Sequence, residues 1–108
     1  MTDFIPRHID NRNLIAAVAE HFGVSQKDML GEGKHRKVSR SRHACMYVFR
    51  NAKGYSLYQI GDVFGRHHTT VLSALRRLED DPDTKSECER LAATYRQISE
   101  FSDRNFYL

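Results

Sequence analysis

Apolar residues recur at every third or fourth position along almost the whole chain, which is the spacing of α-helices that each bury one face. No stretch alternates apolar and polar residues in the manner of a half-buried strand. A chain of 108 residues is long enough for one modest core. We therefore predict an all-α fold that forms a single domain over residues 1–108.

Glycines and helix-capping residues divide this pattern into six predicted helices. Gly23 is a stop signal after the first helix, and Ser25 and Ser56 are N-cap signals for the second and fourth. The predicted helices cover roughly residues 12–22, 26–30, 39–52, 57–64, 67–80 and 85–102. Between them, "GEGKHRK" (31–37) is predicted as a basic loop and "EDDPDT" (79–84) as a break.

The charge is concentrated in the middle of the chain. Residues 32–77 hold ten Lys and Arg against two acids, whereas residues 78–108 hold four bases and eight acids. A basic centre between less basic flanks is typical of a surface that binds a polyanion such as nucleic acid. A solvated basic surface without a partner would have the same composition, so charge alone leaves both interpretations open.

Cysteine spacing and hydropathy limit the class of protein further. Cys45 and Cys88 lie far apart without a C-x-x-C motif, so we predict two buried, reduced thiols. No apolar run approaches the length of a membrane span, and the first ten residues carry no signal-like segment. These features predict a cytoplasmic protein that does not enter a membrane.

The fourth and fifth predicted helices, joined by a short turn with one glycine, have the spacing of a helix-turn-helix over about residues 56–80. Any helical hairpin shares that spacing, so the residues on the outward face of the fifth helix must distinguish a DNA-binding helix-turn-helix from an ordinary hairpin. Its polar members are Arg66, Thr69, Thr70, Ser73, Arg76 and Arg77, and none is acidic. A recognition helix presents such a face to DNA, with its first residues against base edges. The weak helix formers at residues 67–70 are then explained as contact residues.

The segment "SLYQIGDVFGRHHTTVLSALRRLE" resembles the C-terminal DNA-binding domain of the bacterial replication initiator DnaA, a six-helix fold of the Trp-repressor-like helix-turn-helix type. The resemblance extends to "AVAEHFGVSQKDML", the basic loop and "RSRHACMYVFR", and so covers roughly residues 10–100. It implies sequence-specific binding of double-stranded DNA at DnaA boxes. The expected role is regulation of transcription or of replication initiation.

Matched position by position and combined with the outward face, the resemblance implies a set of DNA-contacting residues. His67, His68 and Thr69 would read bases in the major groove, and Thr70 would contact a phosphate. Lys34 matches the side chain that enters the neighbouring minor groove. The full set is Lys34, Arg36, Arg42, His43, Arg50, Tyr58, Arg66, His67, His68, Thr69 and Thr70.

The chain departs from the family pattern in the turn and at two contact positions. The family has two glycines followed by Arg-Asp-His-Thr-Thr, whereas this chain has one glycine followed by Arg-His-His-Thr-Thr. His67 thus replaces the acid that accepts a hydrogen bond from a cytosine amino group. We predict that the preferred site differs at about one base pair, worth roughly 1–3 kcal/mol. His43 stands where the family has glutamine, a second change in contacts.

Other function classes find little support in these 108 residues. The sequence has no G-x-x-x-x-G-K-[ST] loop for ATP and no nucleophile motif, so we predict no enzyme and no cofactor. Adjacent histidines on a helix point about 100° apart, which disfavours a metal site at His67 and His68. Two alternatives stay open: an adaptor that binds a replication or regulatory protein through the acidic last helix, and a fragment of a complete initiator.

Overall fold

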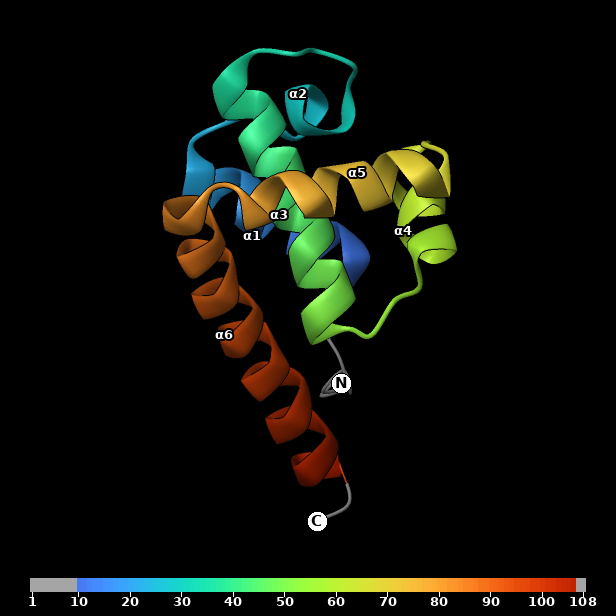
Figure 1. The fold of residues 1–108 in the computed structure, drawn as a ribbon. Helices are drawn as coiled ribbons and strands as arrows, with labels where there is room; N and C mark the ends of the chain where they lie inside the picture. Colours follow the sequence, from blue (N-terminus) through green and yellow to red (C-terminus); the bar gives the residue numbers. More distant parts are fainter. Residues whose placement is uncertain (1–9, 107–108) are drawn as a thin grey trace.

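The computed structural model describes residues 10–106, and the side chains of residues 10–96. Six helices and no strand occur in this part of the chain, as Figure 1 shows, so the all-α prediction is confirmed. In chain order they are α1 (Asn11–Phe22), α2 (Gln26–Leu30), α3 (Arg36–Ala52), α4 (Leu57–Phe64), α5 (His68–Glu79) and α6 (Pro82–Phe106).

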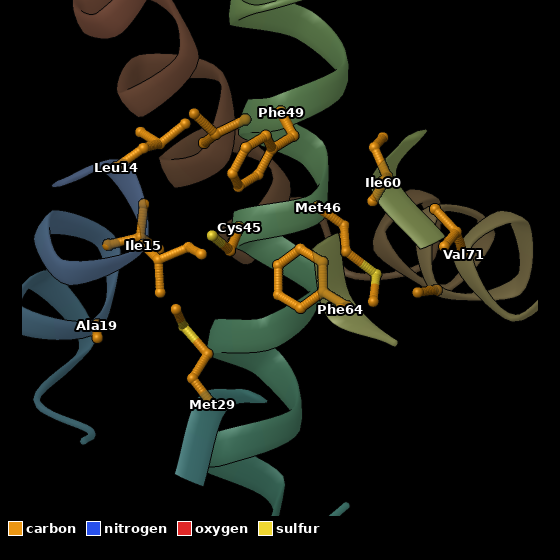
Figure 2. Packing of buried hydrophobic residues seen from close by; sticks show 13 residues of the cluster. Leu14, Ile15, Ala19, Met29, Cys45, Met46, Phe49, Ile60, Phe64 and Val71 are labelled. Carbon is orange, nitrogen blue, oxygen red and sulfur yellow. The ribbon is translucent and has the colours of Figure 1, made fainter. Parts of the chain in front are cut away.

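Helix α3 runs through the centre of the fold, and each of the other five helices packs against it (Figure 1). Phe49 of α3 is fully buried, and its ring meets Phe64 of α4 edge-on at 5.9 Å between centroids. Figure 2 shows the residues around it, including Leu14, Ile15, Ala19, Met29, Cys45, Met46, Ile60 and Val71. One apolar cluster therefore holds α4 and α5 against the rest of the domain.

The helix ends follow the predicted signals. The Ser25 hydroxyl accepts the Asp28 backbone N–H at 3.0 Å, and Gly23 adopts the left-handed conformation with φ of 70°. At α4, Ser56 and Gln59 form a reciprocal capping box with bonds of 3.1 and 2.8 Å. Because these caps satisfy backbone groups locally, they fix where α2 and α4 begin.

Two predicted helix starts are wrong. Helix α3 begins at Arg36 rather than at Ser39, so part of the predicted basic loop is helical. The start was missed because His35, the N-cap, makes no side-chain capping bond and is not a typical capping residue. Helix α6 begins at Pro82 rather than at residue 85, because proline suits the first helical position and the Asp81 carboxylate accepts from the N–H of Thr84 at 3.3 Å.

The end of α6 also differs from the prediction, since the helix continues through Phe106 instead of ending near residue 102. Ile98, expected to line the buried face of this helix, lies outside the residues whose side chains are described. Residues 107 and 108 of the aromatic tail, and residues 1–9, also lie outside the described part.

Both cysteines are buried and free, as predicted. Burial raises the pKa of the Cys45 thiol far above its usual range and raises that of Cys88 to about 12. The thiols therefore stay protonated and behave as small apolar groups. Among residues 10–106, none of the helices combines the length and the apolar character needed to cross a membrane.

Candidate nucleic-acid interface

The turn between α4 and α5 is tight, and two glycines make it so. Gly65 ends α4 with φ of 65°, a conformation that L-residues with a side chain rarely adopt. The Arg66 N–H donates to the Gly61 carbonyl at 2.8 Å, and a Cβ added at Gly61 would lie 2.4 Å from the Arg66 carbonyl oxygen. This close approach packs the turn and the first residue of α5 directly against α4.

Three aromatic rings meet at the open end of α5. The Tyr58 ring, 66% exposed, stacks on His68 with centroids 4.2 Å apart and planes inclined by 27°. His68 in turn lies 4.3 Å from the His67 ring. His67 is the N-cap of α5, and its Nδ1 accepts the Thr69 backbone N–H at 3.3 Å. The start of the helix is thus held by an exposed histidine.

The rest of α5 separates into a buried and an outward face. Val71, Ala74 and Leu78 are buried, and Leu75 is partly buried against the core. Of the outward residues expected from the sequence, Arg66 is half-buried. The others are exposed: Thr69, Thr70, Ser73, Arg76 and Arg77. No acidic residue occurs between His67 and Leu78.

A basic hollow of about 320 Å³ connects this face with the basic loop. It is lined by Lys34, Arg36, Ser39, Arg40, His43, Arg77, Leu78 and Asp81. The single carboxylate, on Asp81, lies 3.8 Å from the Arg40 guanidinium. Residues from the loop, α3 and α5 therefore share one cationic surface, which suits an anionic backbone.

His43 is held neutral in this hollow. Burial, together with the cations of Arg77, Arg42 and Arg66, lowers its pKa from 6.5 to about 4. At neutral pH the ring therefore offers one N–H donor and one nitrogen acceptor and carries no charge.

Arg42 does not lie on this surface, although the resemblance implied a DNA contact there. Its side chain is 6% exposed, and its Nε donates to the Met29 carbonyl at 2.7 Å. Its Nη2 donates to the Asp28 carbonyl at 3.1 Å. Both acceptors are carbonyls near the C-terminus of α2, so Arg42 joins α2 to α3. The structure assigns it a folding role and leaves no exposed guanidinium for DNA.

Two other expected contact residues combine structural bonds with exposure to solvent. The Arg66 guanidinium donates to the Phe64 carbonyl at 2.9 Å and to the Gly31 carbonyl, so it links the helix-turn-helix to the root of the basic loop. Arg50 is exposed, and its Nη1 donates to the Tyr55 carbonyl at 2.9 Å just before α4. Both arginines therefore position the segments that carry other contact residues.

Arg40 and Arg77 complete the basic hollow, although neither is in the expected set of DNA-contacting residues; Arg77 was expected only on the outward face of α5. Arg36, Arg40 and His43 follow one another at i, i+4 and i+7, which places them on one face of α3. That spacing could have indicated a shared basic face. It was missed because the predicted helix begins at Ser39, which leaves Arg36 in the loop.

A comparison with protein families gives a match over residues 12–78 to the family described as the bacterial dnaA protein helix-turn-helix. This chain belongs to that family. Membership supports DNA binding, since the helix-turn-helix described above lies within the matched residues.

Similar proteins are complete initiators. The chain is 35% identical over 97 residues to the chromosomal replication initiator protein DnaA of Thermus thermophilus, covering 87% of this chain and 22% of that protein. It is 40% identical over 85 residues to the DnaA protein of Caulobacter sp., covering 74% of this chain and 18% of the relative. A crystal structure of a DNA replication initiation factor superposes with a TM-score of 0.65 at 25% identity, covering 88% of this chain and 28% of that one. The chain thus spans less than a quarter of the length of these two DnaA relatives.

Proposed function

We propose that this chain is a single-domain, sequence-specific binder of double-stranded DNA, with α5 in the major groove and the basic loop in the neighbouring minor groove. The observation that carries the proposal is the exposed, acid-free outward face of α5, whose last turn lines the basic hollow together with the basic loop and α3. Exposed donors and hydroxyl groups lie at the helix start, and cations lie beside them. This combination fits base edges and phosphates respectively.

The contact residues fall into two groups under this proposal. His67, His68 and Thr69 face base edges, with Tyr58 supporting His68 by stacking. The residues proposed to contact phosphates are the neutral His43, Thr70 at the helix start and six cations: Lys34, Arg36, Arg40, Arg50, Arg66 and Arg77. The proposed activity of these 108 residues is binding without nucleotide hydrolysis, since they hold no phosphate-binding glycine loop. Its biological role is regulation of transcription or of replication initiation.

Selection of binding sites from a random duplex library, followed by affinity measurements, tests the proposal. For about six neutralised phosphates, log affinity should fall with log salt concentration with a slope of about −5. Thr69→Ala should weaken binding to the selected duplex by about 1–3 kcal/mol more than binding to a random duplex. Lys34→Ala should weaken binding to both.

Arg12→Ala is the matched control, because Arg12 is an exposed cation on α1, outside the helix-turn-helix and outside the lining of the basic hollow. We expect this variant to bind both duplexes like the wild-type protein. The proposal is refuted if the library yields no enriched site, or if Thr69→Ala leaves affinity for the enriched site unchanged.

A protein-binding adaptor is the second candidate. The corner between α5 and α6 exposes Asp80, Asp83 and Glu89, whose charge is opposite to that of the basic hollow. A basic partner would fit this surface electrostatically. The double substitution Asp83→Lys and Glu89→Lys separates the two candidates: a DNA regulator should keep its affinity for the selected duplex and its activity in cells, whereas an adaptor should lose its activity in cells.

A further inference from the structure

The two ring nitrogens of His67 have different environments. Nδ1 lies 3.3 Å from the backbone nitrogen of Thr69 and 2.8 Å from its hydroxyl oxygen. A backbone N–H can only donate, so Nδ1 must carry a lone pair to cap the helix. The proton of the neutral imidazole is therefore on Nε2, and the Thr69 hydroxyl also donates to Nδ1.

The cap leaves Nε2–H as an exposed and fixed donor. The His67 side chain is exposed, and no hydrogen bond or ion pair to Nε2 occurs among the side chains described, those of residues 10–96. The ring is held on one side by the cap and on the other by its neighbour His68, which is itself stacked on Tyr58. A donor that is already oriented loses little conformational entropy when it binds.

We propose that His67 determines specificity by donating Nε2–H to an acceptor on the major-groove edge of the DNA, with guanine as the preferred base. This inference rests on the proposed function, because it assumes that the first turn of α5 enters the major groove. Guanine presents two acceptors there, N7 and O6, whereas cytosine presents an amino donor. A fixed N–H donor at this position therefore selects guanine and rejects cytosine.

The Thr69 hydroxyl has the complementary property. Because its proton is directed to Nδ1 of His67, its oxygen remains an acceptor and its methyl group remains apolar. Thr69 can then accept from a base amino group or contact a thymine methyl group. The pair presents a donor and an acceptor side by side.

Asp and Asn substitutions at residue 67 separate the chemistry of recognition from the stability of the helix. Both residues are strong N-caps and have nearly the same shape, so both variants should fold, which circular dichroism and thermal melts would verify. If the cap uses one side-chain oxygen, His67→Asn still presents an N–H donor to the DNA. His67→Asp presents only acceptors.

The experiment is site selection from a random duplex library with the wild-type protein and both variants. Dissociation constants are then measured on four duplexes that differ only at the base pair where the selected sites diverge. The wild-type protein and His67→Asn should prefer guanine at this position by about tenfold, and His67→Asp should prefer cytosine by a similar factor. Preferences at the other positions should not change.

Nitrogen-15 NMR of the wild-type imidazole provides a readout that does not depend on DNA. The proposal requires a neutral His67 ring protonated at Nε2, and a ring protonated at Nδ1 would overturn it. This inference would be refuted, and the proposed function would stand, if His67→Asp selects the same motif as the wild-type protein or if both variants change the motif in the same way. The absence of any enriched motif for the wild-type protein would refute the proposed function together with it.

Discussion

Replacing His43 should remove a specific part of the pH dependence of folding. The folded protein holds this ring neutral to about pH 4, because of burial and the three surrounding arginines, whereas an unfolded chain protonates it near its ordinary pKa of 6.5. Between these two values the unfolded state binds a proton that the folded state does not. The stability of the wild-type protein should therefore fall as the pH decreases from 6.5 toward 4.

The size of the effect follows from the two pKa values. With these two pKa values, protonation of His43 in the unfolded state lowers the unfolding free energy by about 2 kcal/mol between pH 7.5 and pH 5. The ring of His43 is only partly buried, and solvent screening reduces its interaction with the arginines. We therefore expect His43 to account for about 1 kcal/mol of the loss in unfolding free energy over this range.

Urea unfolding at pH 7.5 and pH 5.0 measures this contribution. The fall in unfolding free energy between the two pH values should be about 1 kcal/mol smaller in His43→Gln than in the wild-type protein. His35→Gln is the matched control, because His35 is exposed and should leave the pH dependence as in the wild-type protein. Equal pH dependence in His43→Gln and the wild-type protein would show that burial and the arginines do not hold His43 neutral.

Two substitutions test the packing that positions the interface. Gly61→Ala should lower the unfolding free energy by about 1–3 kcal/mol, since its Cβ would overlap the Arg66 carbonyl oxygen, while Gly33→Ala, which meets nothing within 4 Å, should cost far less. Arg42→Met should cost about 1–3 kcal/mol, because the buried Met29 carbonyl loses its Arg42 donor and the Asp28 carbonyl keeps only the Gly31 N–H, whereas the exposed Arg12→Met should be nearly neutral. Urea unfolding of the four variants checks both, and equal losses in a variant and its control would contradict the assigned contact.

The local signals in the sequence predicted most of the fold because they act over three or four residues. Gly23, Ser25 and Ser56 mark helix ends through bonds within their own turn, and all three were predicted from the chain alone. The start of α3 has no such bond, since His35 makes no side-chain cap. Its position depends on packing against other helices, which the local sequence does not encode.

Arg42 shows why the candidate site could be predicted only in part. Arginine is usually exposed, and a resemblance to DNA-binding proteins reinforces that expectation. In the structure its guanidinium instead satisfies two carbonyls at the end of α2, which is thirteen or more residues away in the chain. Only the tertiary arrangement of α2 and α3 distinguishes this buried donor from exposed cations such as Lys34 and Arg36.

The first turn of α5 joins stability and recognition in one ring. His67 caps the helix through Nδ1, and the same bond determines that Nε2 is the donor presented to solvent. Substitution by alanine would remove the cap and the donor together, so a loss of DNA affinity in that variant could arise from fraying alone. Asp and Asn preserve the cap and differ in the group they present. Comparing those two variants with the wild-type protein therefore separates the capping role of His67 from its proposed role in reading the DNA.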